Sequence, residues 1–429
     1  MISLIALLAA TAAHAAPAPH DLSFDQAIDQ ILGRSTSIPI QRAQLEATQA
    51  HALPAYFSFA PGLSIDAKRS WTGGAADVIL LNTPFRTYEA VSDLNLFRFG
   101  ADIANLQAAR SDVRSQEALL SNTILQAEEE AVRALSAYLE RRQSTQISDK
   151  FVKTQEELYR IARERYKAGY LPQQEVDKVS IDLENEKSRL ADAQVLEAQA
   201  EASLVALLGS ADVDLNWPWK AMLSGKDGKA LGAAPFSLEA RPDWTAAASS
   251  TSAEDQRKWR NRLLLLPSID AAAAYGNTAT ITNGGDIQGP SGPAWHATVT
   301  ATWTLWDHGA AYSNARAQAF AAAQADSRQE RVARDALGDW QASKAAFDIA
   351  VDSAVSRQKS AELARKLYED NLLRFKKGRA SANELSLDQT RLFQNELFAV
   401  QGWSTAHQAF SRLCHSLGKR LASCRPPTH

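Results

Sequence analysis

The sequence predicts a mainly helical protein that also carries four membrane-type β-strands and consists of two copies of one unit. Three observations lead to this fold class. The stretch RYKAGYLPQQE at 165–175 returns as RFKKGRASANE at 374–384, an offset of 209 positions. Several short segments alternate between apolar and polar residues, which is typical of strands. Two very long segments, 101–167 and 310–376, have the apolar spacing of a helix.

The offset of 209 extends well beyond the first pair of stretches. Leu158-Tyr159 returns as Leu367-Tyr368, and Leu208-Gly209 returns as Leu417-Gly418. One offset without net insertion identifies two copies of a single unit. The predicted organisation is a signal peptide at 1–16, a first repeat at 17–209, a linker at 210–240, a second repeat at 241–418 and a tail at 419–429.

The composition excludes several classes of protein. The 429 residues carry 46 basic and 49 acidic side chains, a net charge of −3, so no nucleic-acid partner is expected. After the N-terminus no run of about 18 apolar residues occurs, so no transmembrane helix is predicted. Only two Met residues occur, which argues against a methionine-lined copper path.

The N-terminus predicts export from the cytoplasm. The apolar run ISLIALLAATAAHA ends in Ala13-His14-Ala15, a small-x-small cleavage pattern, although no Lys or Arg precedes it. A buried helix is the alternative interpretation. Cleavage after Ala15 or Ala16 leaves no cysteine at the new N-terminus, so no lipid anchor is expected there.

Each repeat has the same predicted order of elements. A lead-in helix precedes a strand, a Gly-rich loop and a second strand, and a very long helix and a shorter helix follow. The predicted ranges are 37–58, 62–71, 90–99, 101–167 and 173–208 in the first repeat, and 242–262, 267–276, 296–306, 310–376 and 382–417 in the second. The Pro and Gly residues of 210–240 indicate a linker.

The alternating segments have one apolar face. In HATVTATWTLW at 296–306, every second residue from Ala297 to Leu305 is apolar, and Thr or His fills the places between. About ten residues suit a strand that crosses a bilayer at a tilt. The repeat offset matches Leu94 and Leu96 with Trp303 and Leu305, so these four side chains are predicted to face the membrane. A soluble sheet packed on a core would show the same alternation.

Arg69 continues the apolar face of the first predicted strand. It is therefore expected at the rim of the bilayer, where a charge costs about 0–1 kcal/mol. Four strands per chain also leave open edges, whose N–H and C=O groups find no water inside a membrane. Four strands are too few to close a barrel, so membrane-spanning strands would require several chains to share one.

The two long helices have a narrow apolar stripe. At 1.5 Å per residue, 101–167 forms a rod of about 100 Å. Leu106, Val113 and Leu120 are spaced by seven residues, as in coiled coils. This pattern fits a curved wall of side-by-side helices with water on both sides. A plain helical scaffold would explain the helices, but neither the strands nor the signal.

Both long helices end in a basic stretch that a glycine interrupts. The first ends with Arg165, Lys167 and Gly169; the second ends with Arg374, Lys376, Lys377 and Gly378. A carboxylate follows six residues after each glycine, as Glu175 and as Glu384.

No chemical motif for catalysis or metal binding occurs. The sequence has no CxxC, no HExxH and no clustered histidines, so no metal site, cofactor or enzymatic activity is predicted. Cys414 and Cys424 are either joined as a disulfide in an oxidising periplasm or present as two thiols.

Several stretches together resemble a known family. They are LSFDQAIDQIL at 22–32, Arg241-Pro242-Asp243, the strand-to-helix steps ending at Gly100 and at Asp307-His308-Gly309, and the two helix-breaking glycines. In this order, and with the repeat, they resemble the outer-membrane factor (TolC-like) family of efflux and type I secretion channels. The resemblance covers nearly the whole chain after the signal.

The resemblance implies an architecture and a function. Three chains would each contribute four strands to a twelve-stranded β-barrel in contact with outer-membrane lipid. Their helices would form an α-barrel through the periplasm of a Gram-negative bacterium. This homotrimer would be the passive exit duct of a tripartite efflux system. Its partners would be a periplasmic adaptor (membrane fusion) protein and an inner-membrane pump of the resistance-nodulation-division or ABC type.

The resemblance also implies roles for the two helix turns. They would form the periplasmic tip, where the tunnel narrows and the adaptor docks. Glu384 falls on a gate position; Leu387 stands where a second acid often follows, with Asp388 one residue later. Glu175 and Asp177 are the gate candidates of the first turn. Arg165, Lys167, Arg374, Lys376 and Lys377 would hold the closed tip or contact the adaptor. The alternative for the four acids is that they are solvated carboxylates at helix starts, stabilised by the helix dipole. The alternative for the basic residues is that they are solvated surface charges.

Two other functions remain open at this point. Within the same family, the duct would serve type I protein secretion or metal efflux. From a different class, a periplasmic helical scaffold without a pore would be soluble without detergent.

Overall fold

The structure is a computed structural model that describes residues 24–70, 85–209, 235–277, 280–281, 287–288, 293–377 and 379–424. It divides into two compact units. The turn unit comprises Met1–Pro39, Asn122–Arg241 and Ala336–His429; the sheet unit comprises Ile40–Ser121 and Pro242–Asp335. The predicted signal peptide at 1–16 and residues 210–234 of the predicted linker lie outside the described residues.

The predicted helices are all present. They are α1 (Phe24–Arg34), α2 (Ser37–Tyr56), α3 (Ala101–Lys167), α4 (Gln173–Leu208), α7 (Pro242–Leu263), α8 (Ala310–Lys376) and α9 (Ala382–Ser416). Short helices occur at η1 (Phe57–Phe59), η2 (Leu238–Ala240) and α10 (Leu421–Cys424). α3 and α8 each contain 67 residues, and their bounds differ by 209 at both ends. α3 contains no Pro or Gly, so nothing in its sequence interrupts the helix.

Four antiparallel strands form one sheet in the order β1-β2-β3-β6. They are β1 (Gly62–Ser70), β2 (Phe85–Phe97), β3 (Ser268–Asn277) and β6 (Ala294–Thr302). The sequence predicted all four, but β2 begins five residues earlier than expected and β6 ends four residues earlier. A short ladder between β4 (Thr280–Ile281) and β5 (Ile287–Gln288) was not predicted.

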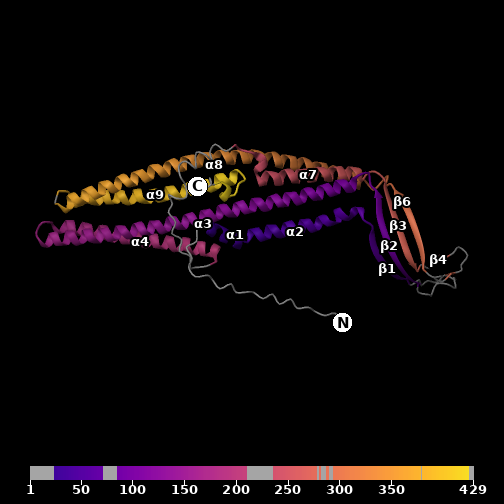
Figure 1. Cartoon of the computed structure of the whole chain (residues 1–429), viewed down its shortest axis with the longest axis horizontal. Helices are drawn as coiled ribbons and strands as arrows, with labels where there is room; N and C mark the ends of the chain where they lie inside the picture. The colour runs from indigo at the N-terminus through magenta and orange to yellow at the C-terminus, as the bar shows by residue number, and fades with distance from the viewer. Residues whose placement is uncertain are drawn as a thin grey trace, which may run out of the picture. The chain divides into compact units, whose positions relative to one another are not determined.

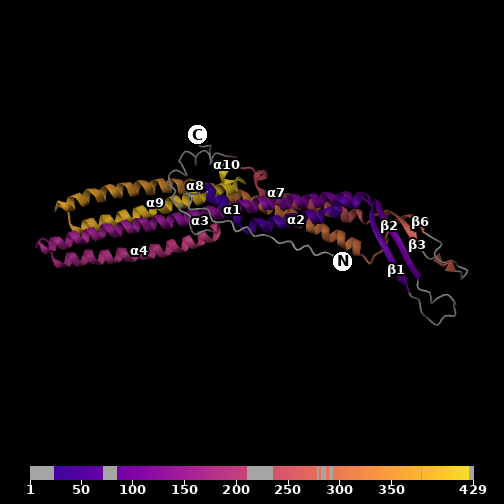
Figure 2. The ribbon, with the colours of Figure 1, turned by 60° about the horizontal axis from the view of Figure 1, so that its bottom comes forward.

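The turn unit has two apolar cores between helix pairs. α3 runs beside α4, and α8 runs beside α9 (Figures 1 and 2). One core contains Leu135, Phe347 and Leu413, each at most 1% exposed. The other, which we call the turn core, lies closer to the helix turns and contains Phe151, Phe375 and Leu385. Each such side chain contributes about 1.5–3 kcal/mol by leaving water.

The helices of the sheet unit approach each other through small side chains. Ala253 is fully buried, and Ser115 Oγ donates a hydrogen bond of 2.9 Å to the carbonyl oxygen of Ala246. Arg257 forms ion pairs with both Asp112 and Glu254. Burial raises the pKa of Asp112, against the charge of Arg257. None of the helices in the described ranges combines the length and apolar composition that a membrane crossing requires.

Each step from the sheet to a long helix contains two left-handed residues in succession. Phe99 and Gly100 have φ of 52° and 90°, and His308 and Gly309 have φ of 61° and 84°. Asp307 supports the second step, because its carboxylate accepts from the N–H groups of Gly309 at 3.1 Å and Ala311 at 2.6 Å. The two steps are 209 residues apart and have the same local backbone.

Candidate functional site: helix turns and sheet faces

The first helix turn ends α3 with a complete Schellman motif. The Gly169 N–H donates to the Tyr166 carbonyl and the Tyr170 N–H to the Arg165 carbonyl, both at 2.9 Å. Gly169 has φ of +79°, a conformation that favours glycine, although a side chain there would meet no atom within 4 Å of its Cβ. The sequence predicted this break, and the structure gives its reason: the backbone must turn left-handed.

The second helix turn repeats part of this pattern. The Arg379 N–H donates to the Arg374 carbonyl at 2.8 Å, 209 residues after the equivalent bond of Tyr170. Gly378 itself lies outside the described residues. α9 then starts with a capping box: Ser381 Oγ accepts from the Glu384 N–H, and the Glu384 carboxylate accepts from the Ser381 N–H, each at 3.2 Å.

The two turns contact each other through one arginine. The Arg165 Nη2 donates to the carbonyl oxygen of Phe375 at 2.9 Å, and its guanidinium carbon lies 4.6 Å from the Phe375 ring centroid. Phe375 is 3% exposed and belongs to the turn core. Lys178 adds a second bridge, because its Nζ donates to Asn383 Oδ1 at 2.7 Å. The first contact joins the ends of α3 and α8, and the second joins the starts of α4 and α9.

The four candidate carboxylates lie in different environments. Glu384 is exposed but occupied by its capping box, and Glu175 holds the equivalent place in the first turn and is half-buried. Asp177 is exposed and accepts from Gln173 Nε2 at 2.7 Å. Within one chain, the contacts of Glu384 are therefore those of a helix-start carboxylate, which is the alternative to a gate residue.

Asp388, the gate candidate four residues after Glu384, has a different environment. It is 6% exposed, Asn371 Nδ2 donates to its carboxylate, and Arg391 lies at 3.5 Å. The repeat explains this position, because Asp388 corresponds to Val179, which is buried in the turn core. The neighbouring Leu387 is 52% exposed. Asp388 is a buried, hydrogen-bonded carboxylate on the inner face of α9.

The remaining basic residues of the turns point to solvent. Lys167, Lys376 and Lys377 are exposed. Arg374 is also exposed and pairs with Asp370 on its own helix at 2.8 Å. Arg165 is thus the one cation among the five predicted tip residues for which the structure shows a contact with the other turn.

The sheet has one apolar and one polar face. The register aligns Leu63, Ser92, Ala273 and Ala297 across the four strands, and the next apolar row contains Ile65, Ala90, Tyr275 and Trp295. Their large members are exposed: Leu63 and Ile65 at 81% and Trp295 at 77%. The opposite face carries Asp93, Asp270, Thr298 and Thr300. No helix of the sheet unit within the described ranges covers this apolar face enough to bury these side chains.

The four side chains predicted to face the membrane divide into two groups. Leu94 lies in β2 on the apolar face, opposite Ala271, and Leu96 is the bulged residue before Phe97. Trp303 and Leu305, however, follow the end of β6 at Thr302. Assigning them to a strand was wrong because the chain already leaves the ladder there: the Trp303 indole donates to the Leu265 carbonyl at 3.2 Å. Both remain exposed, at 60% and 78%.

An ion network links α3 to the C-terminal helices of the turn unit. His415 Nδ1 lies 2.7 Å from Glu129 Oε2, and this hydrogen bond lowers the pKa of Glu129. Glu128 accepts from the Arg420 side chain at 3.2 Å and from the Leu421 N–H at 3.0 Å. Nearby, Arg241 donates to the Ser416 carbonyl at 2.9 Å. The cysteines Cys414 and Cys424 are both buried here, as two thiols without a bond between them.

Sequence reasoning missed Phe375, Asn371 and the Glu129–His415 pair. Phe375 is one residue from Arg374 in a stretch already identified, and Asn371 is four residues further back. Helical spacing alone signals that Asn371 and Phe375 share a face, but not that this face meets Arg165 or Asp388. Among the described residues no group of three or more His, Cys, Asp or Glu side chains is arranged to hold a metal ion.

Comparisons with known proteins agree with this arrangement. Residues 27–210 match the sequence model of a family described as outer membrane efflux protein. No curated protein matches the sequence. The fold is similar to the outer-membrane channel OprN, with a TM-score of 0.75 and 18% identity over 92% of this chain and 89% of that chain.

Two further solved structures have the same fold. For the Campylobacter jejuni CmeC outer membrane channel the TM-score is 0.75 at 14% identity, covering 92% of this chain and 85% of that one. For the open state of the Neisseria gonorrhoeae MtrE outer membrane channel it is 0.76 at 18% identity, covering 93% and 89%.

Proposed function

We propose that this protein is an outer-membrane efflux channel. It resembles the outer membrane efflux proteins in sequence over residues 27–210, and it resembles solved outer-membrane channels in fold over nearly all of its length. It resides in the outer membrane of a Gram-negative bacterium and extends into the periplasm. As part of a tripartite system, it gives passive exit to substrates that an inner-membrane pump drives.

The sheet carries this proposal. Its apolar face exposes Leu63, Ile65, Trp295 and Val299 at 71–81%. Such a face is unfavourable in water and suits lipid. Among the described residues, β1 and β6 each pair on one side only, so both outer edges of the sheet are open there. Edges of this kind must be closed in a membrane.

Closure of the sheet leads to a homotrimer. Three copies provide twelve strands, with β1 of one chain pairing with β6 of the next, and no edge remains. The polar face with Asp93, Asp270 and Thr298 then lines the lumen, and outer-membrane lipid covers the apolar face. A water-soluble periplasmic scaffold would leave this apolar face exposed to water, which is unfavourable.

We infer a two-fold repeat with the boundaries predicted from the sequence: a signal peptide at 1–16, repeats at 17–209 and 241–418, a linker at 210–240 and a tail at 419–429. The equal lengths of α3 and α8 and their offset of 209 support it. In the trimer, the twelve long and shorter helices of the repeats form the α-barrel.

The helix turns are the periplasmic end of this duct. A ring of three Glu384 carboxylates at the entrance favours cations, as rings of acidic side chains do in cation channels. The exposed Lys167, Lys376 and Lys377 present charge to a periplasmic adaptor protein, which connects the duct to a pump of the resistance-nodulation-division or ABC type. The duct catalyses no reaction.

Electron microscopy of the detergent-extracted mature protein tests this function. A three-fold particle with a tubular section beyond the micelle supports it, because α3 alone is a rod of about 100 Å. A compact particle, or a protein that stays soluble without detergent, would contradict the membrane sheet and favour the scaffold.

A further inference from the structure

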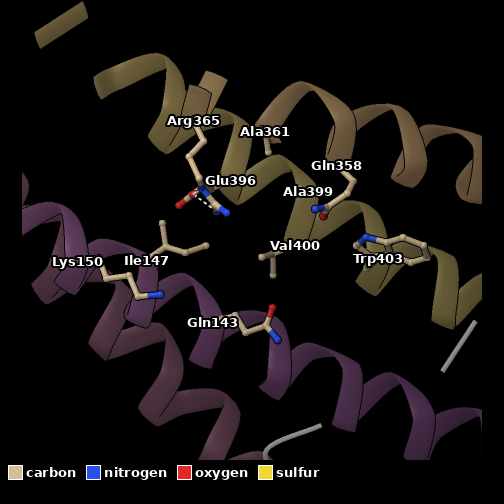
Figure 3. A pocket seen from close by; sticks show the side chains of 10 residues that line it. All are labelled: Gln143, Ile147, Lys150, Gln358, Ala361, Arg365, Glu396, Ala399, Val400 and Trp403. Atoms are coloured by element: carbon tan, nitrogen blue, oxygen red, sulfur yellow. Dashed lines mark hydrogen bonds and ion pairs between the residues drawn. The ribbon is translucent and has the colours of Figure 1, made fainter. Parts of the chain in front are cut away.

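A pocket of about 340 Å³ opens between α3, α8 and α9 in the turn unit (Figure 3). None of the residues assigned above to the gate or to the tip lines it. Its volume lies within the range of small-molecule binding sites, which are concave and mainly apolar with a few well-placed polar groups.

The middle of the pocket is apolar. Ile147 comes from α3, Ala361 from α8, and Ala399 and Val400 from α9. Figure 3 shows Val400 between Ile147 and Trp403, with the indole at one end of the pocket. An aromatic ring of a ligand can therefore lie against Val400 and meet the indole without displacing a charged group.

The end of the pocket opposite Trp403 is basic. Lys150 lies there in Figure 3, and among the described residues its ammonium group has no carboxylate partner. The only acidic side chain of the lining is Glu396, and Arg365 already binds it with two N–H groups, Nε at 3.2 Å and Nη2 closer. The pocket therefore has one net positive charge, located at Lys150.

Trp403 supplies a second, independent observation. Its indole N–H is buried, and no atom of the described residues accepts a hydrogen bond from it. A buried donor without an acceptor is unfavourable. A small outward shift of the indole would allow an oxygen atom of a bound molecule to accept this bond.

We propose that this pocket binds a small organic anion with a flat aromatic body, which places its acid group beside Lys150 and its ring against Val400 and Trp403. The site lies in the helical wall and does not depend on transport, so it goes beyond the proposed channel function. Ring stacking on the indole and the ion pair with Lys150 act at opposite ends of the ligand, which gives it one orientation.

Isothermal titration calorimetry with naphthalene-2-sulfonate tests the site. The mature protein is placed in nanodiscs of zwitterionic phosphatidylcholine, and empty nanodiscs provide the blank for partition into lipid. Saturable binding with one molecule per chain is expected. Lys150→Gln should weaken it by about three- to fivefold, the effect of a solvent-exposed ion pair. Trp403→Ala should weaken it by about tenfold through loss of the aromatic contact.

Lys153→Gln is the matched control, because Lys153 is an exposed lysine of the same helix that pairs with Asp149 and does not line the pocket. Uncharged 2-naphthalenemethanol is the matched ligand and should bind less tightly than the sulfonate. Equal affinities of the wild type and Lys150→Gln, equal affinities for the two ligands, or heats identical to empty nanodiscs would overturn the proposal. Lys150 is exposed, so Lys150→Gln is expected to keep the fold. If Trp403→Ala does not fold, the comparison of Lys150→Gln with the wild type still tests the proposal.

Discussion

Arg165 from the first half of the chain lies against Phe375 from the second half, with its guanidinium over the ring and one N–H on the carbonyl oxygen. Within the described part of the chain, the equivalent residue of the second half, Arg374, makes no such crossing. It pairs with Asp370 on its own helix, where the first half has Ile161 in place of the acid. The first half therefore lacks an acid at the position from which Asp370 holds Arg374.

Replacing Arg165 should loosen the second turn. Arg165→Gln removes the cation–π contact and the hydrogen bond, a loss of about 1–3 kcal/mol. Amide hydrogen exchange at residues 372–377 should accelerate by about tenfold. Arg374→Gln is the control and should change exchange at Arg165 very little, because its ion pair with Asp370 is exposed. Unchanged exchange in Arg165→Gln would show that the contact does not hold the turns together.

Gly169→Ala should destabilise the turn unit by about 1–2 kcal/mol, since an alanine must adopt φ near +79° there. Gly338→Ala is the matched substitution in the interior of α8, where nothing lies within 4 Å and the backbone is helical. It should stabilise by up to about 1 kcal/mol. Thermal unfolding of both variants measures the difference, and equal shifts would exclude the left-handed turn as the cause.

Glu384 and Asp388, the two gate candidates of α9, should behave differently. Glu384→Gln keeps a side chain that can complete the capping box but removes the charge, so the cation selectivity of the reconstituted channel should fall while stability hardly changes. Asp388→Ala should leave Asn371 without its partner and cost about 1–3 kcal/mol. Single-channel reversal potentials and thermal unfolding distinguish the two roles. A loss of selectivity in Asp388→Asn would instead support a gate role for Asp388.

Acid should weaken the Glu129–His415 contact. A carboxylate whose pKa is lowered by folding stabilises the fold above its unfolded-state pKa, and this contribution is lost as pH falls through the folded-state pKa. Wild type should therefore exceed Glu129→Gln in stability by about 1 kcal/mol at pH 7. The difference in stability should disappear at pH values below the ordinary pKa of a glutamate, which is near 4.5. Melting temperatures measured from pH 7 to pH 3 test it, and parallel curves would refute it.

The two faces of the sheet should tolerate charge differently. Val299→Lys places an ammonium group on the apolar face and should cost about 2–4 kcal/mol if that face meets lipid. Thr298→Lys, the adjacent residue on the polar face, should have little effect. The yield of trimer in the outer-membrane fraction compares them. Equal yields would argue against lipid on the apolar face.

Local patterns determined much of this fold. The bounds of α3 and α8 were predictable because no proline or glycine interrupts α3 and each helix stops at a basic, glycine-broken stretch. The faces of the strands were predictable for a similar reason, since alternation fixes them once one residue is placed. The first residues of β2, FRTYE, were missed because charge interrupts their alternation.

The contacts of the turns could not be derived in this way. The resemblance to the outer-membrane factor family makes Asp388 a gate candidate, although its repeat counterpart Val179 is apolar and buried. The crossing of Arg165 depends on which helix lies next to α3, and no short-range pattern contains that information. The end of β6 before Trp303 likewise depends on a bond to the distant Leu265 carbonyl.

The open edges of the sheet have a consequence for how the protein is made. On the proposed assembly, a newly exported copy holds two rows of unsatisfied backbone groups until it meets two others. Maturation then depends steeply on how many copies are exported at one time, and a rare transcript yields disproportionately few finished channels. Cells that need this protein would have to synthesise it in bursts or close together in space.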